Sequence, residues 1–246
     1  MRQLFPDPGE VDPLDAYGRL GRIGDRPAVR LNMIASVDGA ASIGGMSGSL
    51  GGPADKALFA TLRSLADVIL VGATTMQAEG YGPVRLSEKA RDMRRQWGIA
   101  PVPPIAVVTR TPRFDWGSPF FTQAEQRPIV VTTTSAAVAD LDRAAEVAHV
   151  ITAEKPGIGG VDLDAAVSQL GELGHDNVLA EGGPGIAAEL AVDDLLDEVC
   201  LSVSPVLVAG GARRILAGGG DEISTQLELC SLLVADSYLF TRYRRR

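Results

Sequence analysis

Short apolar runs alternate with helix-spaced apolar residues over most of the chain. Apolar runs at residues 68–71, 105–109, 129–132 and 148–152 predict strands, and the continuous run at 68–71 suits a strand covered on both faces. Residues 28–35 and 177–180 also predict strands. Apolar residues that recur with helical spacing predict helices at residues 53–65, 88–97, 163–173 and 185–191. Pro53 suits the first position of the helix that it begins.

The pattern changes toward the C-terminus, where residues 198–204, 226–234 and 237–243 predict strands with no helix between them. Alternating strands and helices followed by consecutive strands are typical of a mainly parallel sheet with an antiparallel extension. We therefore predict an α/β fold with a mainly parallel central sheet, antiparallel C-terminal strands and flanking helices, in one domain over residues 28–246. Residues 1–27 are rich in proline, glycine and aspartate and predict an irregular arm with one helical turn.

Composition and charge narrow the possible functions. Hydrophobic residues make up 46% of the 246 residues and charged residues 22%, as in ordinary globular domains. The formal net charge of −8 argues against a nucleic-acid-binding protein. No apolar stretch approaches the ~20 residues that cross a bilayer, and residues 1–10 lack the apolar core of an export signal. We expect a cytoplasmic protein with a small-molecule substrate and no nucleic-acid or membrane partner.

The sequence contains no motif typical of a metal site, a disulfide framework or a catalytic nucleophile. The two cysteines, Cys200 and Cys230, form neither a disulfide framework nor a CxxC pair. The histidines, His149 and His175, have no metal-ligand spacing, so we expect no metal. Neither a GxSxG nucleophile turn nor a GxxxxGK[ST] phosphate loop occurs.

The first candidate site follows a predicted strand at residues 177–185, which read NVLAEGGPG. Glu181 is followed by Gly182 and Gly183 and then by a predicted helix. Glycines at such a turn let the backbone approach a ligand, and the free N–H groups of a helix start favour phosphate. The alternative is a tight turn that uses glycine for its geometry alone. The GxGxxA match at residue 183 lacks the second parallel strand of a dinucleotide fingerprint, so we discount it.

Two further strand ends carry hydroxyl groups. Residues 68–75 read VILVGATT, so Gly72 is followed by Thr74 and Thr75, which either cap a helix or bind phosphate. Thr109 and Arg110 end another predicted strand, where Arg110 could contact a ligand phosphate or serve as an ordinary surface arginine.

Asp38 lies just beyond the first predicted strand in residues 32–39, NMIASVDG. Ligands of open α/β sheets collect at the carboxyl ends of strands, so Asp38 could orient a substrate or relay a proton. The alternative is an ordinary Asp-Gly turn residue.

Taken in order, these segments resemble the reductase domain of the bacterial bifunctional riboflavin-biosynthesis deaminase/reductase, in a standalone form. The resemblance spans about residues 28–240 and rests on residues 32–39, 62–75, 181–184, 196–199 and 203–207. It implies a dihydrofolate reductase-like fold, a homodimer and NADPH-dependent reduction of a phosphorylated ribosylamino-pyrimidine, with hydride transfer to an imine. The deaminase half is absent, because neither HxE nor PCxxC occurs.

The resemblance also assigns roles to residues. The cofactor would contact Gly72, Thr74, Thr75, Glu181, Gly182 and Gly183, in addition to the local candidates Thr109 and Arg110. The substrate would contact Asp38, Arg63 and Glu181, with Asp38 as the catalytic residue beside the nicotinamide.

The chain departs from the family where the family holds the sugar phosphate. Trp-Ile-Thr and Ala-Arg of the family are replaced by Ser49-Leu50-Gly51 and Asp55-Lys56, and Lys56 lacks the planar fork of arginine. Ser49 and Lys56 therefore occupy the expected substrate-phosphate positions. A dihydrofolate or dihydropterin reductase and a non-catalytic NADPH- or pteridine-binding protein remain alternatives.

Overall fold

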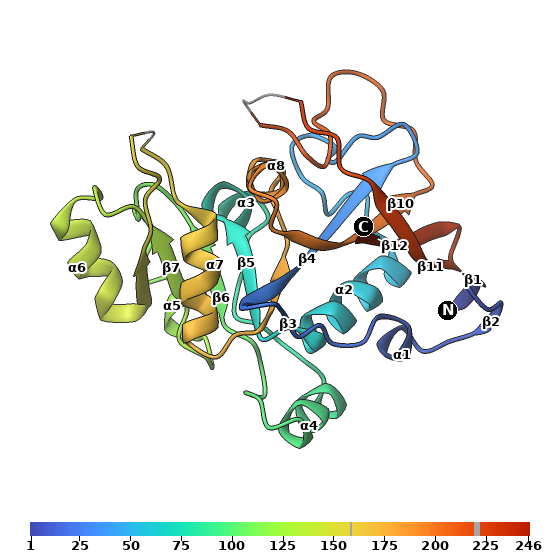
Figure 1. Cartoon of the computed structure of the whole chain (residues 1–246), viewed down its shortest axis with the longest axis horizontal. Helices are drawn as coiled ribbons and strands as arrows, with labels where there is room; N and C mark the ends of the chain where they lie inside the picture. Colours follow the sequence, from blue (N-terminus) through green and yellow to red (C-terminus); the bar gives the residue numbers. More distant parts are fainter. Residues whose placement is uncertain (158, 219–221) are drawn as a thin grey trace.

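A computed structural model describes residues 1–157, 159–218 and 222–246. Within these residues the strands join in one 12-stranded sheet of order β2-β1-β11-β12-β10-β4-β9-β5-β6-β7-β8, with β3 paired to β4 (Figure 1). The strands are β1 (Arg2–Phe5), β2 (Gly9–Glu10), β3 (Arg22–Ile23), β4 (Arg26–Ser36), β5 (Val68–Gly72), β6 (Ile105–Val108), β7 (Ile129–Thr132), β8 (His149–Thr152), β9 (Asn177–Ala180), β10 (Leu196–Ser204), β11 (Leu227–Ala235) and β12 (Tyr238–Arg245).

Helices connect most of the parallel strands, as the alternating pattern predicts. They are α1 (Pro13–Tyr17), α2 (Pro53–Leu65), α3 (Ala73–Ala78), α4 (Glu88–Gln96), α5 (Pro119–Thr122), α6 (Val138–Val147), α7 (Leu163–Glu172) and α8 (Pro184–Val192). The predicted bounds of α2, β7 and β9 agree with the structure. Helix α6 was not predicted, because its many alanine and charged residues give a weak apolar stripe and only Ala144 is buried.

Two apolar cores cover the two faces of the parallel strands. In β5, Ile69 and Val71 pack on one core with α2, whereas Val68 and Leu70 pack on the other core with α7 and α8. Successive side chains of a strand point to opposite faces, so a strand buried on both sides must be apolar throughout. The continuous apolar runs in the sequence reflect this two-sided burial.

The switch to antiparallel pairing comes one strand later than predicted. Strand β10 pairs parallel with β4 over residues 196–204, so it belongs to the parallel part of the sheet. Antiparallel pairing begins with β12, which pairs with β10 and β11. The sequence has no predicted helix between these three strands, and this correctly predicted an antiparallel extension of the sheet. The orientation of β10, however, depends on its long-range pairing with β4.

The N-terminal arm is not irregular. Strand β1 pairs antiparallel with β11 and extends the sheet, and Asp12 caps α1 by accepting the Leu14 backbone N–H. The sequence of β1 shows no strand pattern of buried apolar residues, because three of its four residues are exposed. The predicted helical turn is present as α1, whereas the pairing of β1 with β11 decides the conformation of the residues before it.

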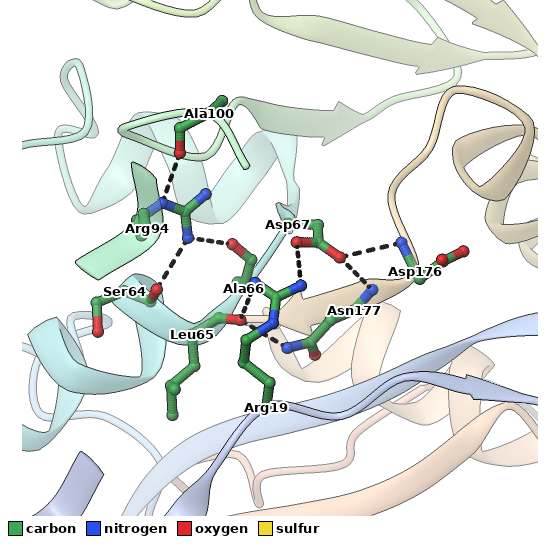
Figure 2. A network of polar contacts seen from close by, with 9 residues as sticks. All are labelled: Arg19, Ser64, Leu65, Ala66, Asp67, Arg94, Ala100, Asp176 and Asn177. Carbon is green, nitrogen blue, oxygen red and sulfur yellow. Dashed lines mark hydrogen bonds and ion pairs between the residues drawn. The ribbon is translucent and has the colours of Figure 1, made fainter. Parts of the chain in front are cut away.

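A polar network fixes the end of α2 that lies away from the strand tips described below (Figure 2). Arg94, fully buried, donates to the carbonyl oxygens of Ser64, Ala66 and Ala100. Asp67 accepts from Arg19 at 2.8 Å and from the Asn177 backbone N–H at 3.0 Å. These contacts satisfy the carbonyl groups at the end of the helix and join it to the starts of β5 and β9.

The carboxyl ends of β4, β9 and β5 lie side by side at one edge of the sheet, because these strands are parallel and adjacent in the order β4-β9-β5. The loop after β4 lies beside residues 206–213, which belong to the segment after β10, at the upper right of Figure 1. None of the helices formed by the described residues is long and apolar enough to cross a membrane.

Candidate active site

A cavity of about 830 Å³ opens at this edge of the sheet. Its walls come from β4, the loop after β4, one face of α2, helix α3 with the residues after it, the residues that follow β9, and residues 211–213 after β10. Such a volume accommodates a small-molecule ligand, and carboxyl strand ends are where open α/β sheets bind them. Among the described residues, no group of three or more His, Cys, Asp or Glu side chains is arranged to hold a metal ion.

The tips of β5 and β9 are in close contact. The Gly72 N–H donates to the Gly182 carbonyl at 2.8 Å, and a Cβ at Gly183 would collide with Oγ1 of Thr75. Gly182 has a φ of +79°, which favours glycine, and a Cβ there would lie 2.9 Å from Sδ of Met33. Glycine is thus required here to bring two strand tips and β4 together.

Helix α8 begins at this contact. Gly183 is its N-cap residue without a side-chain hydrogen bond, and Gly183 and Pro184 line the cavity. Thr74 and Thr75, in the first turn of α3, also line it. The start of α8 and two hydroxyl-bearing residues of α3 therefore line one side of the cavity, which suits the phosphates of a dinucleotide.

Arg63 and Glu181 form a two-pronged ion pair in the cavity wall. Arg63 Nε and Nη2 each lie 2.7 Å from a Glu181 carboxylate oxygen, and the Tyr81 hydroxyl donates to the same carboxylate at 2.7 Å. The Arg63 guanidinium also stacks over the Phe59 ring at 4.2 Å. Burial raises the pKa of Tyr81 well above its ordinary value, so its hydroxyl stays protonated as a donor.

The remaining charges of the cavity lie on its other walls. Lys56 and Arg213 line it, and the described residues include no ion-pair partner within 4.0 Å of either side chain. Asp55 and Glu79 supply negative charge, and Glu79 accepts the Ser47 backbone N–H at 2.6 Å. Burial raises the pKa of Asp55, while the Ser202 hydroxyl and Lys56 act in the opposite direction.

Asp38 does not line the cavity. Its exposed carboxylate accepts from the Ser36 hydroxyl at 2.6 Å and from the backbone N–H groups of Val208 and Ala209 at 3.1 and 2.7 Å. These hydrogen bonds, the one from Ser36 first, lower the pKa of Asp38 to about 2. A carboxyl group with this pKa is ionised at neutral pH and is a poor proton donor. We propose that Asp38 anchors the segment after β10 and is not the proton relay expected from the sequence.

The other predicted contacts divide into two groups. Those that line the cavity are Thr74, Thr75, Glu181, Gly183, Lys56 and Arg63. Gly72 and Gly182 lie behind the wall and form the contact between strand tips. Thr109 hydrogen-bonds within its own turn to Thr111, and the Arg110 side chain is exposed beyond the cavity lining. Ser49 is also exposed and does not line the cavity.

Several cavity residues were not predicted. Asp55 and Phe59 share a stripe of α2 with Arg63 at a spacing of four residues, so the helical period could have identified them. Tyr81 and Arg213 lie in irregular segments, where no periodic signal points to the cavity.

Comparisons with known proteins agree with this architecture. A family model for the RibD C-terminal domain matches residues 27–239. A 2,5-diamino-6-ribosylamino-4(3H)-pyrimidinone 5′-phosphate reductase from Methanothermobacter thermautotrophicus is 28% identical over 83% of this chain and 90% of that protein. A reductase of the same name from Archaeoglobus fulgidus is 26% identical over 75% of this chain and 83% of its own length.

Solved structures agree as well. A pyrimidine reductase-like protein from Corynebacterium diphtheriae superposes with a TM-score of 0.83 at 26% identity, over 95% of this chain and 98% of that chain. A riboflavin biosynthesis reductase from Saccharomyces cerevisiae superposes with a TM-score of 0.70 at 19% identity, over 95% and 98% of the two chains, which supports the fold alone. The α/β fold predicted from the sequence is confirmed. Since the family model covers most of the chain, this protein belongs to the RibD C-terminal domain family.

Proposed function

We propose that the chain is an NADPH-dependent reductase that converts the ribosylamino group of a phosphorylated pyrimidine precursor of riboflavin to a ribitylamino group. The observation that carries the proposal is that Thr74, Thr75 and Gly183 line the same cavity as Lys56 and Arg213. The first three residues suit a dinucleotide, and the two cations suit a phosphorylated substrate. The names of the relatives support this substrate class.

The residues fit a nicotinamide dinucleotide on structural grounds. Gly183 brings a helix start without a side-chain cap to the cavity, and Thr74 and Thr75 line it from the adjacent helix α3. A Cβ at Gly183 would meet Thr75, so this close approach requires glycine. When bound, the nicotinamide supplies a hydride for reduction of the substrate C=N bond.

The protein would contribute placement and electrostatics. Arg63, Glu181 and Tyr81 form a rigid wall of mutually hydrogen-bonded groups beside the cofactor residues. Lys56 would hold the substrate phosphate and so fix the sugar relative to the nicotinamide. Holding two reactants in a fixed orientation accounts for a large part of the rate acceleration in such hydride transfers.

The test is to follow NADPH consumption by the purified protein with the ribosylamino-pyrimidine phosphates and with dihydrofolate. We expect consumption with a pyrimidine phosphate, formation of the ribitylamino product, and none with dihydrofolate. Consumption only with dihydrofolate would replace the proposal with the pterin alternative. Tight NADPH binding without turnover of either would indicate a binding protein.

We also propose that the protein is a homodimer that associates through the antiparallel part of its sheet. Leu4, Phe5 and Leu239 on these strands are each 40 to 43% exposed, which is a high exposure for large apolar side chains. Light scattering during size-exclusion chromatography tests this, and a mass near one chain would contradict it.

A further inference from the structure

The segment after β10 brings an arginine to the cavity from far along the chain. Arg213 lines the cavity, and its backbone carbonyl accepts the Ala41 N–H at 2.8 Å. Four residues earlier, Ala209 donates to Asp38 at 2.7 Å. The backbone of this segment is therefore tied to the loop after β4 at both points, which fixes where the Arg213 side chain begins.

The surroundings of Arg213 suit a phosphate monoester. Ser42 follows Ala41 in the chain, and Ser42, Ser47 and Lys56 line the same cavity. Hydroxyl groups and cations together provide the donors that a phosphate needs, and the guanidinium adds a planar fork that matches two phosphate oxygens. Lys56 alone cannot supply that fork, and the carboxylate of Asp55 offsets part of its charge.

Arg213 and its neighbours follow different strands of the sheet from the residues that we assign to the cofactor. Arg213 and Ala41 follow β10 and β4, whereas Thr74 and Thr75 follow β5, and the order of these strands is β10-β4-β9-β5. The two groups of hydrogen-bond donors therefore follow different strands and line one cavity. The wall at β10 and β4 suits the substrate phosphate, and the wall at β5 and β9 suits the cofactor.

We propose that Arg213 binds the 5′-phosphate of the substrate together with Lys56, and that Asp38 is a positioning residue that holds the Arg213 segment in place. The inference rests on the proposed function for the identity of the substrate. The family arginine that Lys56 replaces is not needed for phosphate binding here, because Arg213 supplies a guanidinium from a different part of the chain. It also gives the Asp38 carboxylate a purpose away from the reacting atoms.

The first experiment measures the affinity of the full chain for ribose 5-phosphate, with ribose and NADPH as comparison ligands, by calorimetry. Arg213→Ala is expected to weaken ribose 5-phosphate binding about 10- to 100-fold, the effect of a charged hydrogen bond, with ribose and NADPH unchanged. The affinity of Arg213→Lys for ribose 5-phosphate should lie between the affinities of the unchanged protein and of Arg213→Ala. Arg214→Ala is the matched control, because Arg214 is exposed and absent from the cavity lining, and it should change binding by less than about twofold.

The second experiment tests the positioning role of Asp38. Asp38→Ala should raise KM for the phosphorylated substrate while kcat is preserved, and should leave NADPH binding unchanged. The Asp38→Ala and Arg213→Ala double variant should bind ribose 5-phosphate no more weakly than Arg213→Ala alone, since both changes disable the same contact. Additive losses, or a fall in kcat without a change in KM, would overturn this role.

Equal effects of Arg213→Ala and Arg214→Ala would overturn the phosphate assignment. A loss confined to NADPH, with NADH and ribose 5-phosphate unaffected, would also overturn it and assign Arg213 to the cofactor 2′-phosphate. Because sugar-phosphate binding is measured without turnover, these results are distinguishable from a failure of the proposed reduction.

Discussion

Arg63 and Glu181 lie 118 positions apart in the sequence, yet they form a two-pronged ion pair with both N–O distances at 2.7 Å. The pair joins α2 to the end of β9 and forms part of the cavity wall. The Glu181 side chain is 1% exposed, so its charge depends on Arg63 for compensation.

Removing one partner of this pair should therefore be costly. Arg63→Met leaves the buried Glu181 carboxylate without its guanidinium, and we expect the free energy of unfolding to fall by about 3–5 kcal/mol. Tyr81→Phe removes only one hydrogen bond to the same carboxylate and should cost less, about 1.5–3 kcal/mol. Urea denaturation measures both values. Equal small losses would contradict the compensating role of Arg63.

The contact between Gly183 and Thr75 gives a prediction that a second substitution should reverse. Gly183→Ala places a methyl group against Oγ1 of Thr75, so the strand tips must separate. We expect weaker NADPH binding, by at least about tenfold, from the displaced phosphate wall. Thr75→Ala removes the colliding atom, and the double variant should recover part of the thermal stability that Gly183→Ala loses. No recovery would mean that Thr75 is not the source of the clash.

The low pKa of Asp38 predicts how the segment after β10 responds to acid. A carboxyl group whose folded pKa, about 2, lies below its ordinary value of 3.8 stabilises the fold above pH 3.8, and this contribution disappears as the pH falls through 2. Hydrogen exchange should therefore show the Val208 and Ala209 amides protected at pH 4 and exposed near pH 2. In Asp38→Asn this protection should already be weaker at neutral pH. Protection lost between pH 6 and 5 would point to a different group.

Arg94 provides a prediction about stability away from the cavity. Burial lowers its pKa to about 10, and it satisfies three carbonyl oxygens in the network of Figure 2. Arg94→Met leaves these acceptors without a donor and should destabilise the protein by at least about 3 kcal/mol. Arg95→Met is a control in the same helix, because Arg95 forms an exposed pair with Asp92 and should contribute less than about 1 kcal/mol.

The fold was predictable where burial leaves a regular mark on the sequence. Strand β9 and helix α2 have strong apolar patterns, and their bounds agree with the structure. Strand β1 and helix α6 expose most of their side chains, so no pattern identified them. The orientation of β10 depends on pairing with β4, which lies about 170 residues earlier, and local pattern carries no such information.

The lining of the cavity was predictable where a strand end is followed by glycine or hydroxyl residues. Thr75 and Gly183 were identified because the parallel strands that precede them must end at one edge. Asp38 follows a strand in the same way, but its side chain turns toward the segment after β10. Arg213 could not be identified, because its position depends on a loop-to-loop hydrogen bond with Ala41.

The most direct test of the proposed reduction is to follow the hydride itself. The purified protein would be incubated with the ribosylamino-pyrimidine phosphate and NADPH deuterated at nicotinamide C4, and the product analysed by mass spectrometry and NMR. The account predicts one deuterium at C1′ of the ribitylamino product from one stereoisomer of the cofactor. Product without deuterium from either stereoisomer, or no product while the cofactor is bound, would contradict it.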